Sequence, residues 1–259
     1  MNTKLRLLLA SLLVSSVTFA GVSGGNYGGV SITDSTSPHN LSARLGDDDN
    51  GEVCVYCHTP HAANISFAGA PLWNKSDSNE TQVYTTYGTT VGGTEANTTI
   101  ASASLVCLSC HDGISAVDSI ANAPGSGMQP IAGSQNIVNI LGTPYGGNIG
   151  GTMGVSAASG ATAVDLSNDH PISIVYTPGR ASLRETTDTL DDGENNESWV
   201  TPSGSQLVSA LLRGGNVECV SCHDPHNATG VAQSATNIQV NYLRHTNERS
   251  ELCFGCHAK

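Results

Sequence analysis

The chain has 259 residues, of which 10 are Lys or Arg and 22 are Asp or Glu, so its formal net charge at pH 7 is −12. This balance disfavours nucleic-acid binding, which depends on clustered basic side chains. Large apolar side chains are also scarce, with 3 Phe, 7 Tyr and 2 Trp against 29 Gly. Ordinary side chains alone would therefore form a thin core for a chain of this length.

Residues 1–20 have the features of a secretory signal peptide. Lys4 and Arg6 precede a mostly apolar stretch at 7–17, and the small residues Thr18 and Ala20 precede a plausible cleavage site. The apolar stretch is too short to span a bilayer, and no later segment is longer. The sequence therefore predicts an exported protein without a membrane span, located outside the cell or at its surface, with the periplasm as the alternative.

Residues 21–123 form a first module that contains two Cys-x-x-Cys-His motifs. His39 comes first, and the sequence CVYCHTPH at 54–61 and the sequence CLSCH at 107–111 follow. Residues 124–159 are rich in Gly, Ser, Thr and Ala, which is typical of an irregular connecting segment.

Residues 160–259 repeat the plan of the first module. His170 comes first, the sequence CVSCHDPH follows at 219–226, and a plain CFGCH motif follows at 253–257. His39 and His170 both begin a His-x-x-Ser sequence. Local patterns predict short strands at 172–176 and 238–243, and a helix at 205–213 that ends at two glycines.

Every cysteine of the chain belongs to one of four Cys-x-x-Cys-His motifs, the attachment pattern of c-type haem. Two thiols three positions apart can add to the two haem vinyl groups, and the next residue places an imidazole under the iron. The pattern predicts four covalently attached c-type haems. Their attachment residues are Cys54, Cys57, Cys107, Cys110, Cys219, Cys222, Cys253 and Cys256, and the proximal iron ligands are His58, His111, His223 and His257.

Other uses of paired cysteines explain the sequence less well. A disulfide scaffold does not require a histidine after each pair, and neither does a set of zinc sites. A thioredoxin-like redox motif would occur once, beside a βαβ pattern, and would not recur four times.

Five further histidines can supply the second axial ligands of the four irons. The candidates are His39, His61, His170 and His226, while His245 falls outside the repeated plan and is an uncertain spare. His61 and His226 each follow a proximal histidine by three residues. They would point to the same side as that histidine, so each should ligate a neighbouring haem and not its own.

Long loops with few regular elements predict a distinctive fold class. We expect a multihaem cytochrome c, mostly irregular coil with a few short helices and strands, wrapped around a stacked haem chain. Loops of this length are unusual in a compact domain unless a bound group organises them.

Several of these sequences resemble a known family. CVYCHTPH with the sequence PLWN at 71–74, DHP at 169–171 and CVSCHDPH look like the doubled Cys-x-x-Cys-His proteins of metal-reducing bacteria. The haem count, the length and the early histidine resemble the extracellular cytochrome-filament, or nanowire, group. The resemblance implies a head-to-tail homopolymer in which His39 ligates a haem of the neighbouring subunit. A monomer in which His39 ligates its own haem stays open.

The expected function is electron transfer, because irons with two histidine ligands have no open position for a substrate. The chain is not expected to be an enzyme. Its partners would be copies of itself and other redox proteins or extracellular acceptors. The alternatives are a monomeric periplasmic electron shuttle and a multihaem reductase with one open haem.

Overall fold

The computed structural model describes much of the chain outside its N-terminal and central segments. The described residues are 30–35, 37, 39–44, 52–67, 70, 72–75, 83–86, 99–112, 120–122, 163–167, 172–180, 182–191, 193, 199–228, 232–234, 237–239, 242–245 and 247–258. The predicted signal peptide, the connecting segment 124–159 and His170 lie outside them.

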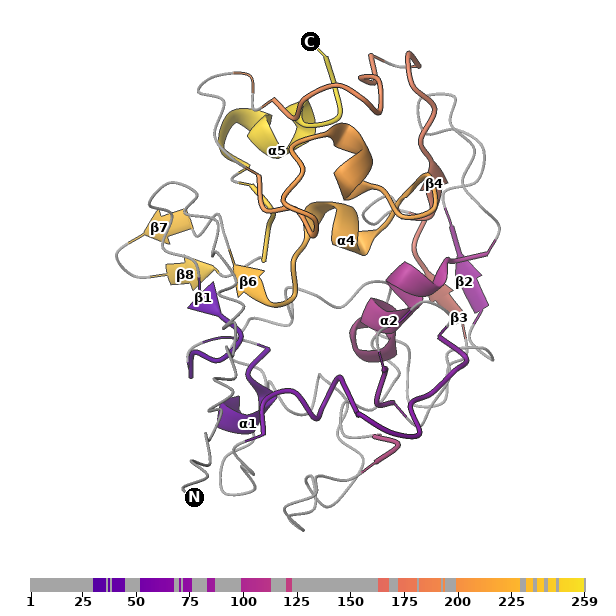
Figure 1. The fold of residues 1–259 in the computed structure, drawn as a ribbon, viewed down its shortest axis with the longest axis vertical. Coiled ribbons are helices and arrows are strands. Elements are labelled where there is room, and N and C mark those ends of the chain that lie inside the picture. Colours follow the sequence, from indigo (N-terminus) through magenta and orange to yellow (C-terminus); the bar gives the residue numbers. More distant parts are fainter. Residues whose placement is uncertain are drawn as a thin grey trace, which may run out of the picture.

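Regular elements are few and short, and irregular coil joins them (Figure 1). The helices are α1 (Leu41–Arg44), α2 (Ser102–His111), η4 (Val208–Leu211), α4 (Cys219–Cys222), η5 (Glu248–Ser250) and α5 (Glu251–Phe254). The strands are β1 (Val30–Ser31), β2 (Val83–Thr85), β3 (Ala163–Asp165), β4 (Ile174–Val175), β5 (Asn216–Val217), β6 (Asn227–Ala228), β7 (Ala232–Ser234) and β8 (Asn237–Gln239). The prediction of a largely irregular fold is confirmed.

The strands pair two by two, and two of these pairs join the two halves of the chain. β1 is antiparallel to β6, with Val30 opposite Ala228. β2 is parallel to β3, with Tyr84 opposite Val164. The other two pairs, β4 with β5 and β7 with β8, are antiparallel. The two predicted modules are therefore interleaved in space.

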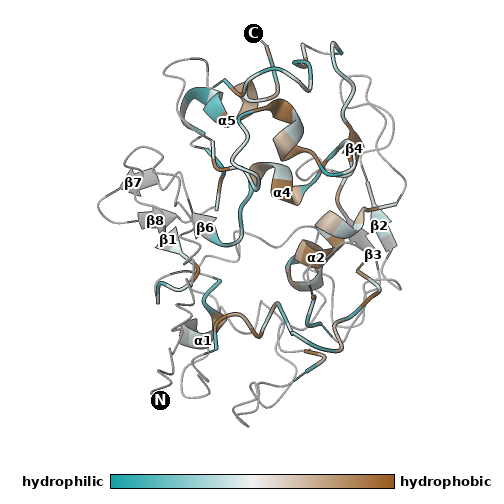
Figure 2. Cartoon of the chain, in the orientation of Figure 1, coloured by the Kyte–Doolittle hydropathy of each residue, from teal (hydrophilic) through white to brown (hydrophobic). Residues whose placement is uncertain are grey.

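Two small apolar clusters flank the helices, and Figure 2 shows hydrophobic residues along α2, α4 and β4. The cluster beside α2 consists of Ile100, Leu108, Leu166 and Ile172. The cluster near the C-terminus consists of Tyr176, Leu190, Trp199, Val208 and Leu211. Among the described residues no helix is long and apolar enough to cross a membrane.

The helix predicted at 205–213 is wrong over most of its length. Only the 3-10 turn η4 forms, because the residues before it bond to another segment. The backbone N–H of Leu190 donates to the carbonyl of Gln206, and the Gln206 side chain bonds both backbone groups of Trp199. The glycine turn after it does form, with φ of +59° at Gly214 and +82° at Gly215.

The two predicted strands form in reduced lengths. The strand at 172–176 is limited to β4, since Ser173 has a φ of +54° that interrupts an extended backbone. The strand at 238–243 corresponds to β8, which ends at Gln239, and to an isolated bridge between Leu243 and His223.

Candidate haem-attachment site

The first motif is a tight turn that buried polar groups hold in place. The backbone N–H of His58 donates to the carbonyl of Cys54 at 2.8 Å, which closes one helical turn. Asn74 is fully buried and its side chain donates to the carbonyl of Val55 at 2.6 Å. The backbone N–H of Asn74 donates to the carbonyl of Cys57. The loop is therefore fixed from its inner side.

The second motif forms the last turn of α2, which ends at His111. Trp73 links it to the first motif. The Trp73 indole N–H donates to the Ser109 hydroxyl at 3.2 Å, and the Trp73 ring packs edge-on against His58. Trp73 therefore contacts both of the first two motifs.

The third and fourth motifs repeat the geometry of the first. The backbone N–H of His223 donates to the carbonyl of Cys219 at 3.0 Å, and that of His257 donates to Cys253 at 2.9 Å. In the fourth motif, a Cβ atom on Gly255 would lie 2.4 Å from the ring of Trp199. Only glycine fits this contact. In each motif one helical turn places the two thiols on the same side, as attachment to one ring requires.

Two pairs of histidines from distant parts of the chain lie opposite each other. The ring centroids of His58 and His226 are 6.1 Å apart, and those of His39 and His111 are 5.9 Å apart. Two imidazoles on opposite sides of one iron have centroids about 6 Å apart, since each metal–nitrogen bond is about 2 Å and each ring centre lies about 1 Å beyond its nitrogen. Both separations fit a bis-histidine haem.

The predicted distal histidine of each pair, His39 or His226, has an acceptor near its Nδ1 atom. His39 Nδ1 lies 3.1 Å from the carbonyl of Pro225, and His226 Nδ1 lies 3.6 Å from the carboxylate of Asp224. An acceptor at Nδ1 fixes the tautomer and leaves Nε2 for a metal. The residues present therefore fit axial ligation by Nε2 at the first and second motifs.

Electrostatics differ between the two distal histidines. Burial, assisted by the neighbouring His111, lowers the pKa of His39 to about 4, so its imidazole is neutral at pH 7. The hydrogen bond to Asp224 raises the pKa of the more exposed His226. Burial opposes ionisation of Asp224, but its hydrogen bonds with His226 hold the pKa of this carboxyl below its usual range.

Most of the cysteine thiols have raised pKa values and are protonated at pH 7. Burial raises the pKa of Cys57 to about 12, that of Cys222 to about 11 and that of Cys256 to about 12. All eight cysteines are free of disulfide bonds. Reactive or metal-binding thiolates need the opposite shift. Neutral, unpaired thiols at this spacing suit covalent attachment to a vinyl group.

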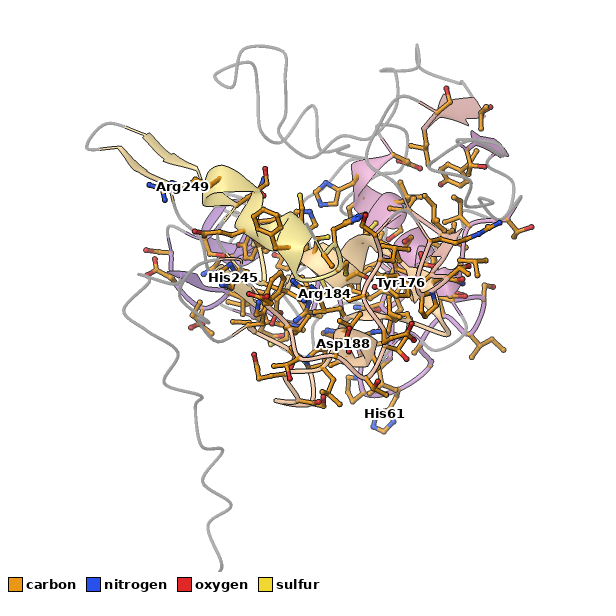
Figure 3. All side chains as sticks on the ribbon, turned by 90° about the horizontal axis from the view of Figure 1, so that it is seen from above. His61, Tyr176, Arg184, Asp188, His245 and Arg249 are labelled. Atoms are coloured by element: carbon orange, nitrogen blue, oxygen red, sulfur yellow. The ribbon has the colours of Figure 1, made fainter. Side chains whose placement is uncertain are left out.

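The other histidine candidates have contrasting positions (Figure 3). His61 is exposed and projects at the edge of the side-chain mass. His245 is 4% exposed and stacks on Trp199 with 4.6 Å between ring centroids. The Nε2 atom of His245 is buried. Its surroundings are those of a core histidine.

Two contacts of the distal histidines differ in how well the sequence signals them. The Tyr242 ring stacks on His39 at 4.3 Å, and its hydroxyl accepts from the His39 backbone N–H at 3.0 Å. No local pattern marks this tyrosine. Asp224 does have a signal, because an acidic residue two positions before His226 can reach the imidazole.

Residues 211–259 match the family model described as the doubled CXXCH motif, which covers the third and fourth motifs. No curated protein matches the chain. The match indicates a multihaem c-type cytochrome, which is a class of electron-transfer proteins with covalently attached haem.

Proposed function

We propose that this chain carries electrons through four c-type haems, each with two axial histidines and no open position. The opposed pairs His58–His226 and His39–His111 carry the proposal, because their centroid distances fit six-coordinate iron. Haem bound at the motifs would supply a one-electron iron couple and an extended conjugated ring. The chain's own residues hold the rings in place and fix the orientation of each imidazole.

The attachment thiols of successive motifs lie near one another in chain order. The sulfur of Cys57 is close enough to interact with that of Cys110, Cys107 with Cys219, and Cys222 with Cys253. Rings attached at these points would form one continuous series from the first motif to the fourth. This order supports a conduit in which electrons pass through the length of the subunit.

The contacts of His39 support ligation of a haem within its own chain. Its ring faces His111, and its contacts with Tyr242 and Pro225 tie it to the second half of the same chain. Ligation of a neighbouring subunit's haem by His39 stays a prediction, and these contacts support the alternative within one chain. A subunit-bridging ligand would have to be another histidine.

His61 is the better candidate for a bridge between subunits. Its equivalent in the second module, His226, crosses to the first motif. The His61 side chain is exposed, and its backbone carbonyl accepts from Thr59 and Asn122 at 2.9 Å each. We therefore propose that it ligates the third-motif haem of another copy.

The surface near His61 is suited to a contact between copies. On the same loop, Ile65 is 92% exposed and Leu72 is 54% exposed. A contact between unlike surfaces that does not close on itself produces an open filament. With a predicted export signal, the proposal is an extracellular or cell-surface filament with minerals, electrodes or other redox proteins as acceptors.

Electron microscopy of the purified, haem-loaded chain tests the assembly, with His61→Ala beside His245→Ala as a matched control. We expect filaments from the parent and the control, and separate subunits with one five-coordinate haem from His61→Ala. Filaments that persist in His61→Ala would contradict the bridging role. A parent that is monomeric with four low-spin haems would instead indicate a periplasmic shuttle, and carbon monoxide binding by the parent would indicate a reductase.

A further inference from the structure

The attachment points of the second and third motifs are joined directly. The Cys107 sulfur on α2 and the Cys219 sulfur at the start of α4 lie close enough to interact. The backbone N–H of Cys219 also donates to the Ser104 hydroxyl at 3.1 Å. Because α2 belongs to the first predicted module and α4 to the second, an electron travelling along the subunit changes module at this contact.

A buried carboxylate organises this contact. Glu218 is 1% exposed, and one of its oxygens accepts from the Ser104 hydroxyl at 2.5 Å and from the Ser173 hydroxyl at 3.0 Å. Ser173 in turn accepts from the backbone N–H of Ala101, just before α2. Glu218 therefore ties together the start of α2, the start of α4 and the segment before β4.

The backbone at Ser173 shows how tightly this network is specified. Its φ is +54°, a left-handed conformation that costs a residue other than glycine about 1 kcal/mol. Ser173 is also fully buried. In this conformation its hydroxyl accepts from the Ala101 backbone N–H and donates to the Glu218 carboxylate.

A buried Glu218 costs free energy that an apolar residue joining the two helices would not cost. A buried carboxylate must be desolvated, and apolar residues of similar volume often stabilise a fold at least as well. Within the described part of the chain Glu218 forms no ion pair. Its side chain also accepts from the backbone N–H of Ser221 in a capping box, and only its Oε1 atom is buried without a hydrogen-bond partner. Its carboxylate is therefore held by hydrogen-bond donors and by no described cation, next to two haem-attachment thiols.

We propose that Glu218 is a positioning residue for electron transfer between the modules, and that its charge lowers the reduction potentials of the haems attached at the second and third motifs. This inference rests on the proposed function. One electron would leave a ferrous iron on one side of the contact and reduce a ferric iron on the other, with no bond made or broken. A nearby negative charge stabilises the ferric state.

The test uses the full haem-loaded chain and three single variants. Glu218→Gln keeps the shape and the acceptor oxygen but removes the charge, Glu218→Ala removes both, and Glu185→Gln is a control because Glu185 is exposed. The readouts are haem content by mass, the Soret circular dichroism that reports haem–haem geometry, and a potentiometric titration.

We expect Glu218→Gln to raise two of the four potentials and to keep the parent's circular dichroism. Glu218→Ala should also change the circular dichroism, and Glu185→Gln should change neither. If both Glu218 variants carry four haems and keep the parent's potentials and dichroism, the inference is overturned.

If Glu218→Ala loses haem, the double variant Ser104→Ala/Ser173→Ala tests the positioning role instead. It removes the two hydroxyl donors and keeps the carboxylate. A changed circular dichroism is expected, and an unchanged one would overturn the positioning role. Failure of the proposed function has a separate signature, because an open haem would then appear in the parent before any substitution.

Discussion

The imidazole rings of His58 and His226 lie 6.1 Å apart with planes inclined by 23°, although they belong to the first and third motifs. The separation fits two ligands on opposite sides of one iron. A haem iron between these two rings would join the first module to the second. We therefore expect the free energy of unfolding to depend on bound haem.

His39→Ala should open one coordination position at the second motif. We expect one of four haems to become high-spin and to bind carbon monoxide, because His39 faces His111. Optical spectra of the reduced protein with carbon monoxide measure this directly. Four unchanged low-spin haems would contradict the assignment.

His245→Ala should behave differently, since His245 is a core residue stacked on Trp199. Removing a buried ring leaves a cavity that costs about 2 kcal/mol of the free energy of unfolding. All four haems should stay six-coordinate. Denaturant unfolding combined with the carbon monoxide assay checks both statements, and a high-spin haem in this variant would show that His245 is a ligand.

Asp224→Asn should raise the potential of the haem at the first motif. Asp224 contacts His226 Nδ1, and a carboxylate at this position makes the imidazole a stronger donor that favours ferric iron. The same change removes the ionic partner of the buried Arg244 side chain, 3.6 Å away, so the thermal midpoint should fall. Asp191→Asn, which breaks the Arg184 ion pair, is the matched control and should leave this potential unchanged.

Acid should release the His39 ligand only at low pH. The pKa of His39 in the fold is about 4 against 6.5 for an unperturbed histidine, so between these values only the unfolded chain binds a proton there. The contribution of His39 to stability is complete above about pH 6.5 and declines as the pH falls to about 4. A spectral titration should therefore show the second-motif haem low-spin down to about pH 4. Conversion near pH 6 that depends on His39 would contradict this.

The local chemistry of the site could be predicted from the sequence, because it depends on residues that are neighbours in the chain. Cys54, Cys57 and His58 form one turn whatever surrounds them, and the same holds for the other motifs. The pairing of His226 with His58 could not be predicted in this way, since it depends on how distant segments fold together. The same is true of the stacking of Tyr242 on His39.

Secondary structure was harder to predict where tertiary contacts override local preference. Gln206 bonds Trp199 and removes the start of an expected helix. In contrast, α2 forms although Ala101 provides no capping side chain, because Leu108 and Ser104 are buried at its inner face. In a chain with so few apolar residues, the positions of single buried side chains decide such elements.

The most direct measurement is a cryo-EM map of the native, haem-loaded protein, because it shows the ligands of every iron. We predict that His226 lies opposite His58 and that His39 lies opposite His111, both within one chain. A map with another residue opposite His58 or His111, or with either iron five-coordinate, would contradict the central claim.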